Sequence, residues 1–168
     1  AEALQVLQQF GGETLIYPER GPCPKSFLEG FLYLRLGDKE KAQAALEQAR
    51  IVAERLVRDA PDDPGRHAQL GAVFAGLGKK EDAVNEGRKA VELLPESQDA
   101  FDGPQATAAL AEIYACVGEQ DEALRLLDHL LTVPSGLTVP TLKVDPVWDP
   151  LRKDQRFQGL IDKYASKG

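Results

Sequence analysis

The sequence predicts an all-α protein built from successive helix pairs. Its composition is typical of a folded chain, with 43% apolar and 28% charged residues over 168 positions and no long low-complexity tract. One pattern occurs three times, at 26–50, 67–95 and 107–134. Self-similarity of this kind indicates a repeat architecture, in which each unit buries its apolar face against the next.

The repeated pattern has four positions with a physical meaning. A small residue lets the paired helix approach closely, and an aromatic residue one turn later fills the space between the two helices. A glycine then supplies the positive φ that ends the first helix, and an alanine is the small residue of the second. The equivalent positions are Gly30, Tyr33, Gly37 and Ala42; Gly71, Phe74, Gly78 and Ala83; and Ala111, Tyr114, Gly118 and Ala123.

In chain order, we expect one domain over 1–168. Residues 1–10 predict a leftover helix from a preceding unit, and residues 11–24 a loop too rich in Gly and Pro to be helical. Three helix pairs follow at 25–60, 64–95 and 104–133. The second and third open on Asp63-Pro64 and Asp102-Gly103-Pro104, a helix cap followed by proline. Because the chain starts inside an amphipathic pattern and lacks methionine, we expect a piece of a longer protein.

Residues 145–165 predict a C-terminal cap for the array. Asp154 precedes a helix whose apolar positions lie at i, i+3, i+4 and i+7, namely Phe157, Leu160, Ile161 and Tyr164. The polar positions that should face water are Arg156, Gln158, Asp162 and Lys163. We expect Trp148, the single tryptophan, to be a buried anchor against helix 119–132. The alternative is a catalytic or ligand-binding corner.

The charge balance disfavours two classes of partner. With 27 acidic and 20 basic side chains the formal net charge is -7, which repels nucleic-acid phosphates and anionic lipid. No apolar run reaches the length of a membrane span, and no signal peptide opens the chain. Two isolated cysteines, Cys23 and Cys116, suit a reducing compartment. We therefore expect a cytoplasmic chain.

No catalytic, metal or cofactor site is expected. The stretch "LGKK" at 77–80 has the Gly-Lys of a phosphate-binding loop, but Val73 replaces the first glycine and Lys80 the hydroxyl residue. A His-Glu-x-x-His motif is absent, and Ser135 lacks the glycine spacing of a nucleophile elbow. We expect His67 at a packing position and His129 on a solvated face. A buried or half-buried thiol is the expectation for Cys116, whereas the loop setting of Cys23 allows an exposed, reactive one.

These repeats resemble the tetratricopeptide repeat. The middle copy matches best, with Ala90 and Pro95 closing it. It departs at His67, where the family favours Trp, and at Gly87, where it favours a large apolar residue. The resemblance implies a right-handed α-solenoid of about three helix pairs, with a preceding half repeat and a C-terminal capping helix.

A narrower resemblance covers nearly the whole chain. The strings "ELLPESQDAFDGP", "PSGL" and, above all, "DPVWDPLRKDQRF" are similar to the C-terminal tetratricopeptide regions of bacterial multidomain signalling proteins. There the repeats follow a serine/threonine kinase, nucleotide cyclase or winged-helix domain. The resemblance implies a signalling context and an interaction surface.

The family binds partners in the concave groove lined by the first helix of each pair. The positions implied here are Phe27, Phe31, Leu34, Arg35, Ala68, Ala72, Ala75, Gln105, Ala108, Glu112 and Ala115. Because Ala68 and Ala72 replace the polar donors that would hold a terminal carboxylate, an apolar or mixed segment suits the lining better. The other interpretation is that these small residues only permit tight stacking.

Three kinds of function stay open. The first is a scaffold that binds a peptide or protein segment. The second is a sensory module whose groove binds a small ligand or an intramolecular segment and biases an attached effector domain. The third is a spacer or oligomerisation element. A groove plugged by residues 11–24 would favour an intramolecular occupant.

Overall fold

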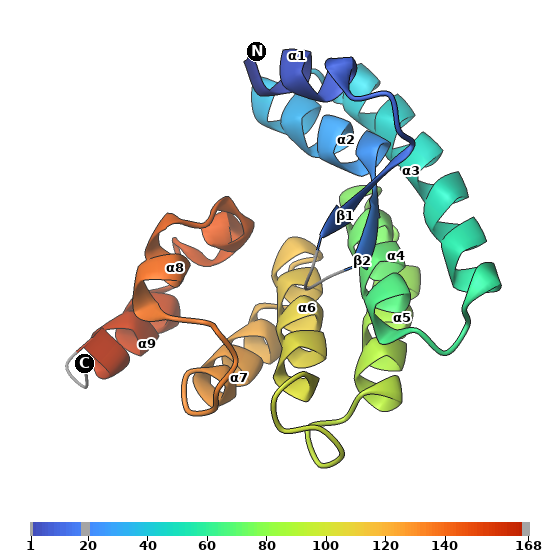
Figure 1. The fold of residues 1–168 in the computed structure, drawn as a ribbon. Helices are drawn as coiled ribbons and strands as arrows, with labels where there is room; N and C mark the ends of the chain where they lie inside the picture. Colours follow the sequence, from blue (N-terminus) through green and yellow to red (C-terminus); the bar gives the residue numbers. More distant parts are fainter. Residues whose placement is uncertain (1, 18–20, 166–168) are drawn as a thin grey trace.

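The computed structural model describes residues 2–17 and 21–165, and these are predominantly helical, as the sequence predicts (Figure 1). The helices are α1 (Glu2–Gln9), α2 (Lys25–Leu36), α3 (Lys39–Asp59), α4 (Pro64–Gly76), α5 (Lys80–Leu93), α6 (Gly103–Cys116), α7 (Gln120–Leu130), α8 (Val139–Val144), the 3-10 helix η1 (Pro146–Leu151) and α9 (Gln155–Ala165). Two short strands, β1 (Thr14–Tyr17) and β2 (Gly21–Pro24), lie between α1 and α2. No described helix is both long and apolar enough to cross a membrane.

Three pairs of consecutive helices pack closely, α2 with α3, α4 with α5 and α6 with α7. Gly37, Gly78 and Gly118 stand in the turns within these pairs, with φ of 79°, 73° and 82°. A residue with a Cβ rarely adopts these angles. The predicted role of the three glycines in ending the first helices is therefore confirmed.

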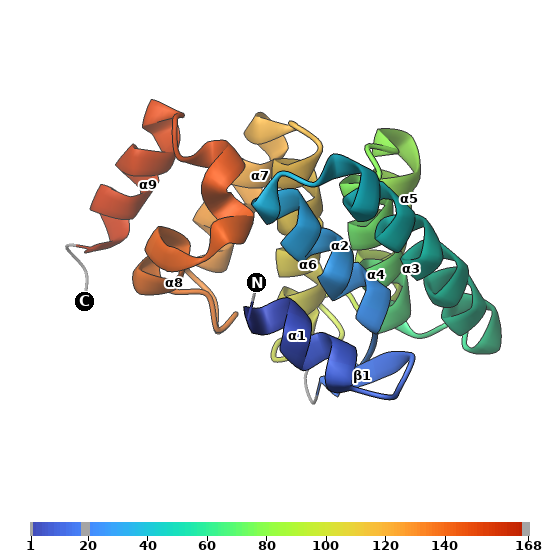
Figure 2. The same ribbon diagram turned by 90° about the horizontal axis from the view of Figure 1, so that it is seen from above.

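The pairs follow one another around an arc, and α8, η1 and α9 lie at its far end (Figures 1 and 2). Neighbouring pairs are joined by packing of α3 on α4, of α5 on α6 and of α4 on α6. The contact between the first and second pairs differs, because the strand β2 packs against α2, α3 and α4. Helices alone join the second pair to the third, whereas a strand also takes part in joining the first pair to the second.

The segments Thr14–Tyr17 and Gly21–Pro24 pair as the two strands of a hairpin, so the prediction of a loop over 11–24 is wrong for these residues. The strands pair antiparallel with Leu15 opposite Cys23 and Ile16 opposite Pro22. β-Branched and aromatic residues in "TLIY" favour an extended backbone, and pairing with a distant stretch is not visible from Gly and Pro content. The Cys23 thiol is 4% exposed, which excludes the exposed, reactive thiol that the loop assignment allowed.

Several helices begin with a side-chain cap, at Asp38, Asp63, Thr138 and Asp145, and the cap at Asp63 was predicted. Asp63 accepts from the backbone N–H of Gly65 at 2.9 Å, and Pro64 follows at the first position of α4. Asp38 accepts from the Lys41 N–H at 3.1 Å at the start of α3. Asp102 stands at the cap position of α6 without a side-chain bond. Instead Asp99 accepts from the N–H groups of Phe101 and Asp102.

The C-terminal segment, residues 139–165, covers the third pair and begins earlier than predicted, at α8. Trp148 is 1% exposed and belongs to a core with α6 and α7 residues, so its predicted burial is confirmed. The backbone of η1 lies beside α6, and α9 lies beside α7. Trp148 shares its core with α7 residues such as Leu127 and Leu130, in agreement with its expected position against the second helix of the pair. Phe157 and Ile161 face the core, and the four polar positions of α9 are exposed.

Candidate interaction surface

The structure places the eleven predicted groove residues on α2, α4 and α6. On α2, Phe27 is half-buried, whereas Phe31, Leu34 and Arg35 are exposed. On α4, Ala68 and Ala72 are half-buried, and Ala75 is 6% exposed. On α6, Gln105, Ala108 and Glu112 are half-buried, and Ala115 is fully buried. Ala115 is thus enclosed by helix packing, and Ala75 offers almost no accessible surface.

These positions do not form one continuous row. The helices α4 and α6 pack on each other, which brings their predicted residues onto adjacent helices. On the other side of α4 lies the strand β2. Phe27 packs into a cluster with Ala49, Ala53, Leu70 and Val73. It therefore joins the first pair to the second.

An apolar patch stands on α2. Phe31 is 38% exposed and Leu34 is 44% exposed, and their spacing of three residues puts them on one face of the helix. The helix α1 packs against α2 (Figure 1); its Val6 is exposed, as is Phe10, which directly follows the helix. Most of the exposed large apolar side chains that the structure describes lie in the first 36 residues.

Arg35 is engaged by the far end of the chain. Its Nη1 lies 3.6 Å from Oδ2 of Asp149 in η1, and both side chains are about half exposed. Asp149 also accepts a hydrogen bond from Arg152 Nε at 2.6 Å. The Arg152 bond, followed by the charge of Arg35, holds the pKa of Asp149 below its ordinary value. No local signal in the sequence pairs residue 35 with residue 149.

His67 is buried at 7% exposure, as its packing position predicts, and it is also a polar junction. Its Nδ1 lies 2.6 Å from Oε2 of Glu86 in α5, and its Nε2 lies 2.8 Å from the carbonyl oxygen of Pro61. The ring therefore ties α4 to α5 and to the turn before α4. This accounts for a histidine where the resembled family favours Trp, because an indole has a single N–H donor.

His129 is exposed, as predicted, and pairs with Glu96 at 2.7 Å. The second carboxylate oxygen of Glu96 accepts from the hydroxyl of Thr107 at 2.8 Å. Glu96 lies in the segment between α5 and α6, and its two bonds connect that segment to both α6 and α7. Cys116, at the end of α6, is exposed as a residue, but burial raises the pKa of its thiol, which agrees with the expectation of a half-buried thiol. In the part of the chain that the structure describes, no three His, Cys, Asp or Glu side chains are grouped to hold a metal.

A cleft of about 530 Å³ opens between α5 and the third pair, away from the predicted residues. Its lining is Lys80, Glu81, Val84, Asn85, Arg88, Tyr114, Glu119 and Glu122. Lys80 forms an ion pair with Glu119, and Arg88 Nε donates to the Tyr114 hydroxyl at 3.1 Å. The cleft therefore contains acidic and basic side chains, some of which pair with each other. Its lining includes no histidine or cysteine that could form a nucleophile–base pair.

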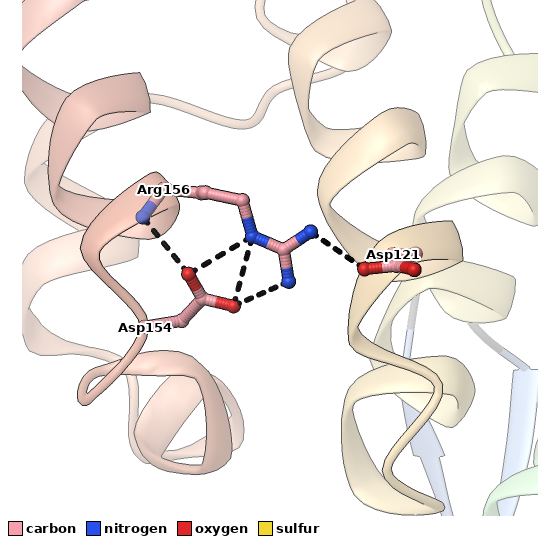
Figure 3. Close-up of polar contacts among 3 residues, drawn as sticks. All are labelled: Asp121, Asp154 and Arg156. Carbon is pink, nitrogen blue, oxygen red and sulfur yellow. Dashed lines mark hydrogen bonds and ion pairs between the residues drawn. The ribbon is translucent and has the colours of Figure 1, made fainter.

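The charged run after Trp148 forms a structural cluster (Figure 3). Arg156 donates from Nη2 to Asp154 at 2.7 Å and from Nη1 to Asp121 of α7 at 2.6 Å. Asp154 also accepts from the backbone N–H of Arg156 at 2.9 Å. The Arg156 bonds lower the pKa of Asp154, so this carboxyl is ionised near neutral pH and unsuited to act as a general acid.

Comparison with known proteins gives no matching family model and no matching curated protein.

Proposed function

We propose that this chain is a protein-interaction module that binds a peptide or protein segment along the first helices of its pairs. In this proposal the helix pairs form a right-handed tetratricopeptide-like α-solenoid, and the chain is part of a larger bacterial signalling protein. The observation that carries the proposal is the exposed apolar patch of Phe31 and Leu34 on α2. Contiguous exposed apolar side chains on a folded protein commonly mark an interaction site.

One further observation supports the binding of a segment. Ala68, Ala72 and Ala108 on α4 and α6 are half-buried and therefore partly accessible. A peptide backbone can approach small side chains closely, while larger apolar anchors supply affinity. In this proposal Phe31 and Leu34 of α2 are the anchors.

Selection from a random peptide display library against the full chain, followed by titration of the selected peptides, tests the proposal. The double variant Phe31→Ala, Leu34→Ala should weaken binding by about tenfold or more, as expected when interface anchors are truncated. The control is Ile51→Ala on α3, a somewhat more exposed apolar side chain at 52%, which should leave binding unchanged. Equal affinity of the double variant and the control would exclude the α2 patch as the binding surface.

The second candidate is a regulatory module whose first helices hold an intramolecular segment and bias an attached domain. It is favoured by the packing of β2 on α2, α3 and α4, since part of the 11–24 segment lies between the first two pairs. Thermal unfolding across a metabolite panel tests the small-ligand form of this candidate, and a flat response would count against it.

A further inference from the structure

We propose that the outer edge of β1 binds an extended peptide segment as an added antiparallel or parallel strand. This deepens the proposed function and rests on it, because it names the conformation and chemistry of the segment. The occupant is an extended, proline-free strand with apolar side chains and a net positive charge. The argument starts from the hydrogen-bond register of the hairpin.

The register shows which groups of β1 face outward. The Lys25 N–H donates to the Glu13 carbonyl at 2.8 Å, so these two residues are a hydrogen-bonded pair. Such pairs alternate with non-hydrogen-bonded pairs along an antiparallel ladder. Leu15 opposite Cys23 is therefore bonded, whereas Thr14 opposite Pro24 and Ile16 opposite Pro22 are not. The N–H and C=O groups of Thr14 and Ile16 consequently point away from β2.

The two prolines of β2 agree with this register. Proline has no N–H to donate, and both prolines stand at non-bonded positions, with their nitrogens turned away from β1. The far side of β2 is also covered by α2, α3 and α4. An added strand is therefore excluded from β2 and has only the β1 edge to use.

The β1 edge is unprotected in the described part of the chain. Among the described residues, no backbone or side-chain group accepts a hydrogen bond from the N–H of Thr14 or Ile16. Protected edge strands commonly carry lysine, proline or a bulge, and none of these occurs at Thr14, Leu15 or Ile16. Ile16 is instead 82% exposed. An open edge of this kind is the template for strand addition.

Apolar side chains flank the edge and set the chemistry of its occupant. A Cβ on Gly12 would lie 2.7 Å from the Phe10 ring and 3.4 Å from the Thr14 carbonyl oxygen. The Phe10 ring, 44% exposed, therefore borders the edge at one end, and Ile16 stands at the other. Cross-strand contacts with apolar or β-branched residues of the incoming strand would supplement the few backbone bonds.

A second copy of this chain fits the edge poorly. Two outward residues offer only a narrow contact, whereas a stable association of folded chains buries about 800 Å² per partner. Two copies would also each bring a formal charge of -7, which opposes their approach. A basic peptide strand avoids both costs, because it is attracted by the charge and can follow the edge without matching a second folded surface.

The variant Ile16→Pro removes the outward-facing backbone N–H and so tests whether that group donates to an added strand. Proline is tolerated in edge strands where its N–H would face solvent, so the hairpin should persist, and far-UV circular dichroism checks this. Ile16→Ala is the matched control, which loses the side chain and keeps the N–H. With basic peptides selected from the display library as probes, Ile16→Pro should bind at least about tenfold more weakly than Ile16→Ala.

Amide exchange measured by NMR on the unmodified chain gives an independent readout. Saturation with a selected peptide should slow exchange of the Thr14 and Ile16 amides by at least about tenfold, while the exposed N–H of Gly11 stays fast. Unchanged exchange at both amides would overturn strand addition.

The outcomes separate this inference from the proposed function. If Ile16→Pro binds like Ile16→Ala while the Phe31, Leu34 double variant loses binding, strand addition is wrong and the α2 surface stands. If neither variant loses binding, or the library yields no binder, both proposals fail. If gel filtration shows a dimer that Ile16→Pro dissociates, the occupant is a second copy and the assigned peptide is wrong.

Discussion

Gly71 and Gly87 show how single residues set the contact between the second and third pairs. A Cβ on Gly71 would lie 2.7 Å from Cδ1 of Ile113 and 3.0 Å from the carbonyl oxygen of Ala83. A Cβ on Gly87 would lie 2.8 Å from the same Ile113 methyl group. Ile113 of α6 thus fills the space between α4 and α5. A larger side chain at either glycine would collide with Ile113.

Replacing Gly71 by alanine should lower the free energy of unfolding by about 1–3 kcal/mol, because one contact is a backbone carbonyl that cannot rotate away. The matched change is Gly159→Ala in α9, where a Cβ would meet nothing within 4 Å. It should stabilise the chain by about 0.5–1 kcal/mol, since alanine has the higher helix propensity. Urea unfolding followed by circular dichroism measures both. A neutral Gly71→Ala would contradict the close packing of Ile113.

At the scale of elements, the C-terminal segment depends on its aromatic anchor. Trp148, Leu142 and Leu151 are essentially inaccessible in one core with α6 and α7. Trp148→Ala should cost about 3–5 kcal/mol, the range for a large aromatic side chain removed from a core. Val144→Ala, at a residue 75% exposed, should change the free energy of unfolding by less than about 0.5 kcal/mol. Urea midpoints give both values, and a near-neutral Trp148→Ala would restore the interpretation of this stretch as a binding corner.

The elements also show what the sequence could and could not predict. Helix ends at Gly37, Gly78 and Gly118 follow from local backbone chemistry, and the apolar spacing of α9 follows from its own period. The hairpin was missed because its stability depends on pairing of 14–17 with 21–24 and on packing against three helices. Of the candidate site, Phe31 and Leu34 were named from the family resemblance, and both side chains are exposed. The burial of Ala75 and Ala115 was not predictable, because it depends on neighbouring units.

For the whole molecule, acid stability should reflect carboxyl groups held by cations. Hydrogen bonds from Lys41, Arg152 and Arg156 lower the pKa of Asp38, Asp149 and Asp154 below the ordinary value of 3.8. A pKa lowered by folding contributes stability above the unfolded value, and the contribution is lost as pH falls through the folded value. We therefore expect the urea midpoint to fall as pH drops below 3.8.

Asp154→Asn tests the part of this dependence that belongs to the Arg156 cluster. Asparagine can still accept the Arg156 backbone N–H but carries no charge. The difference in urea midpoint between the two chains should be largest near neutral pH and should shrink below pH 3.8. It should also shrink at high salt, because exposed ion pairs are screened. A difference independent of pH would show that the Asp154 charge contributes nothing.

The contact between Arg35 and Asp149 gives the arc a property that its separate helix pairs lack. Units that touch only their neighbours fray from the two ends independently. The ion pair between α2 and η1 instead couples local unfolding at one terminus to local unfolding at the other. Because half-exposed ion pairs weaken with ionic strength, we expect this coupling between the two termini to be lost at high salt.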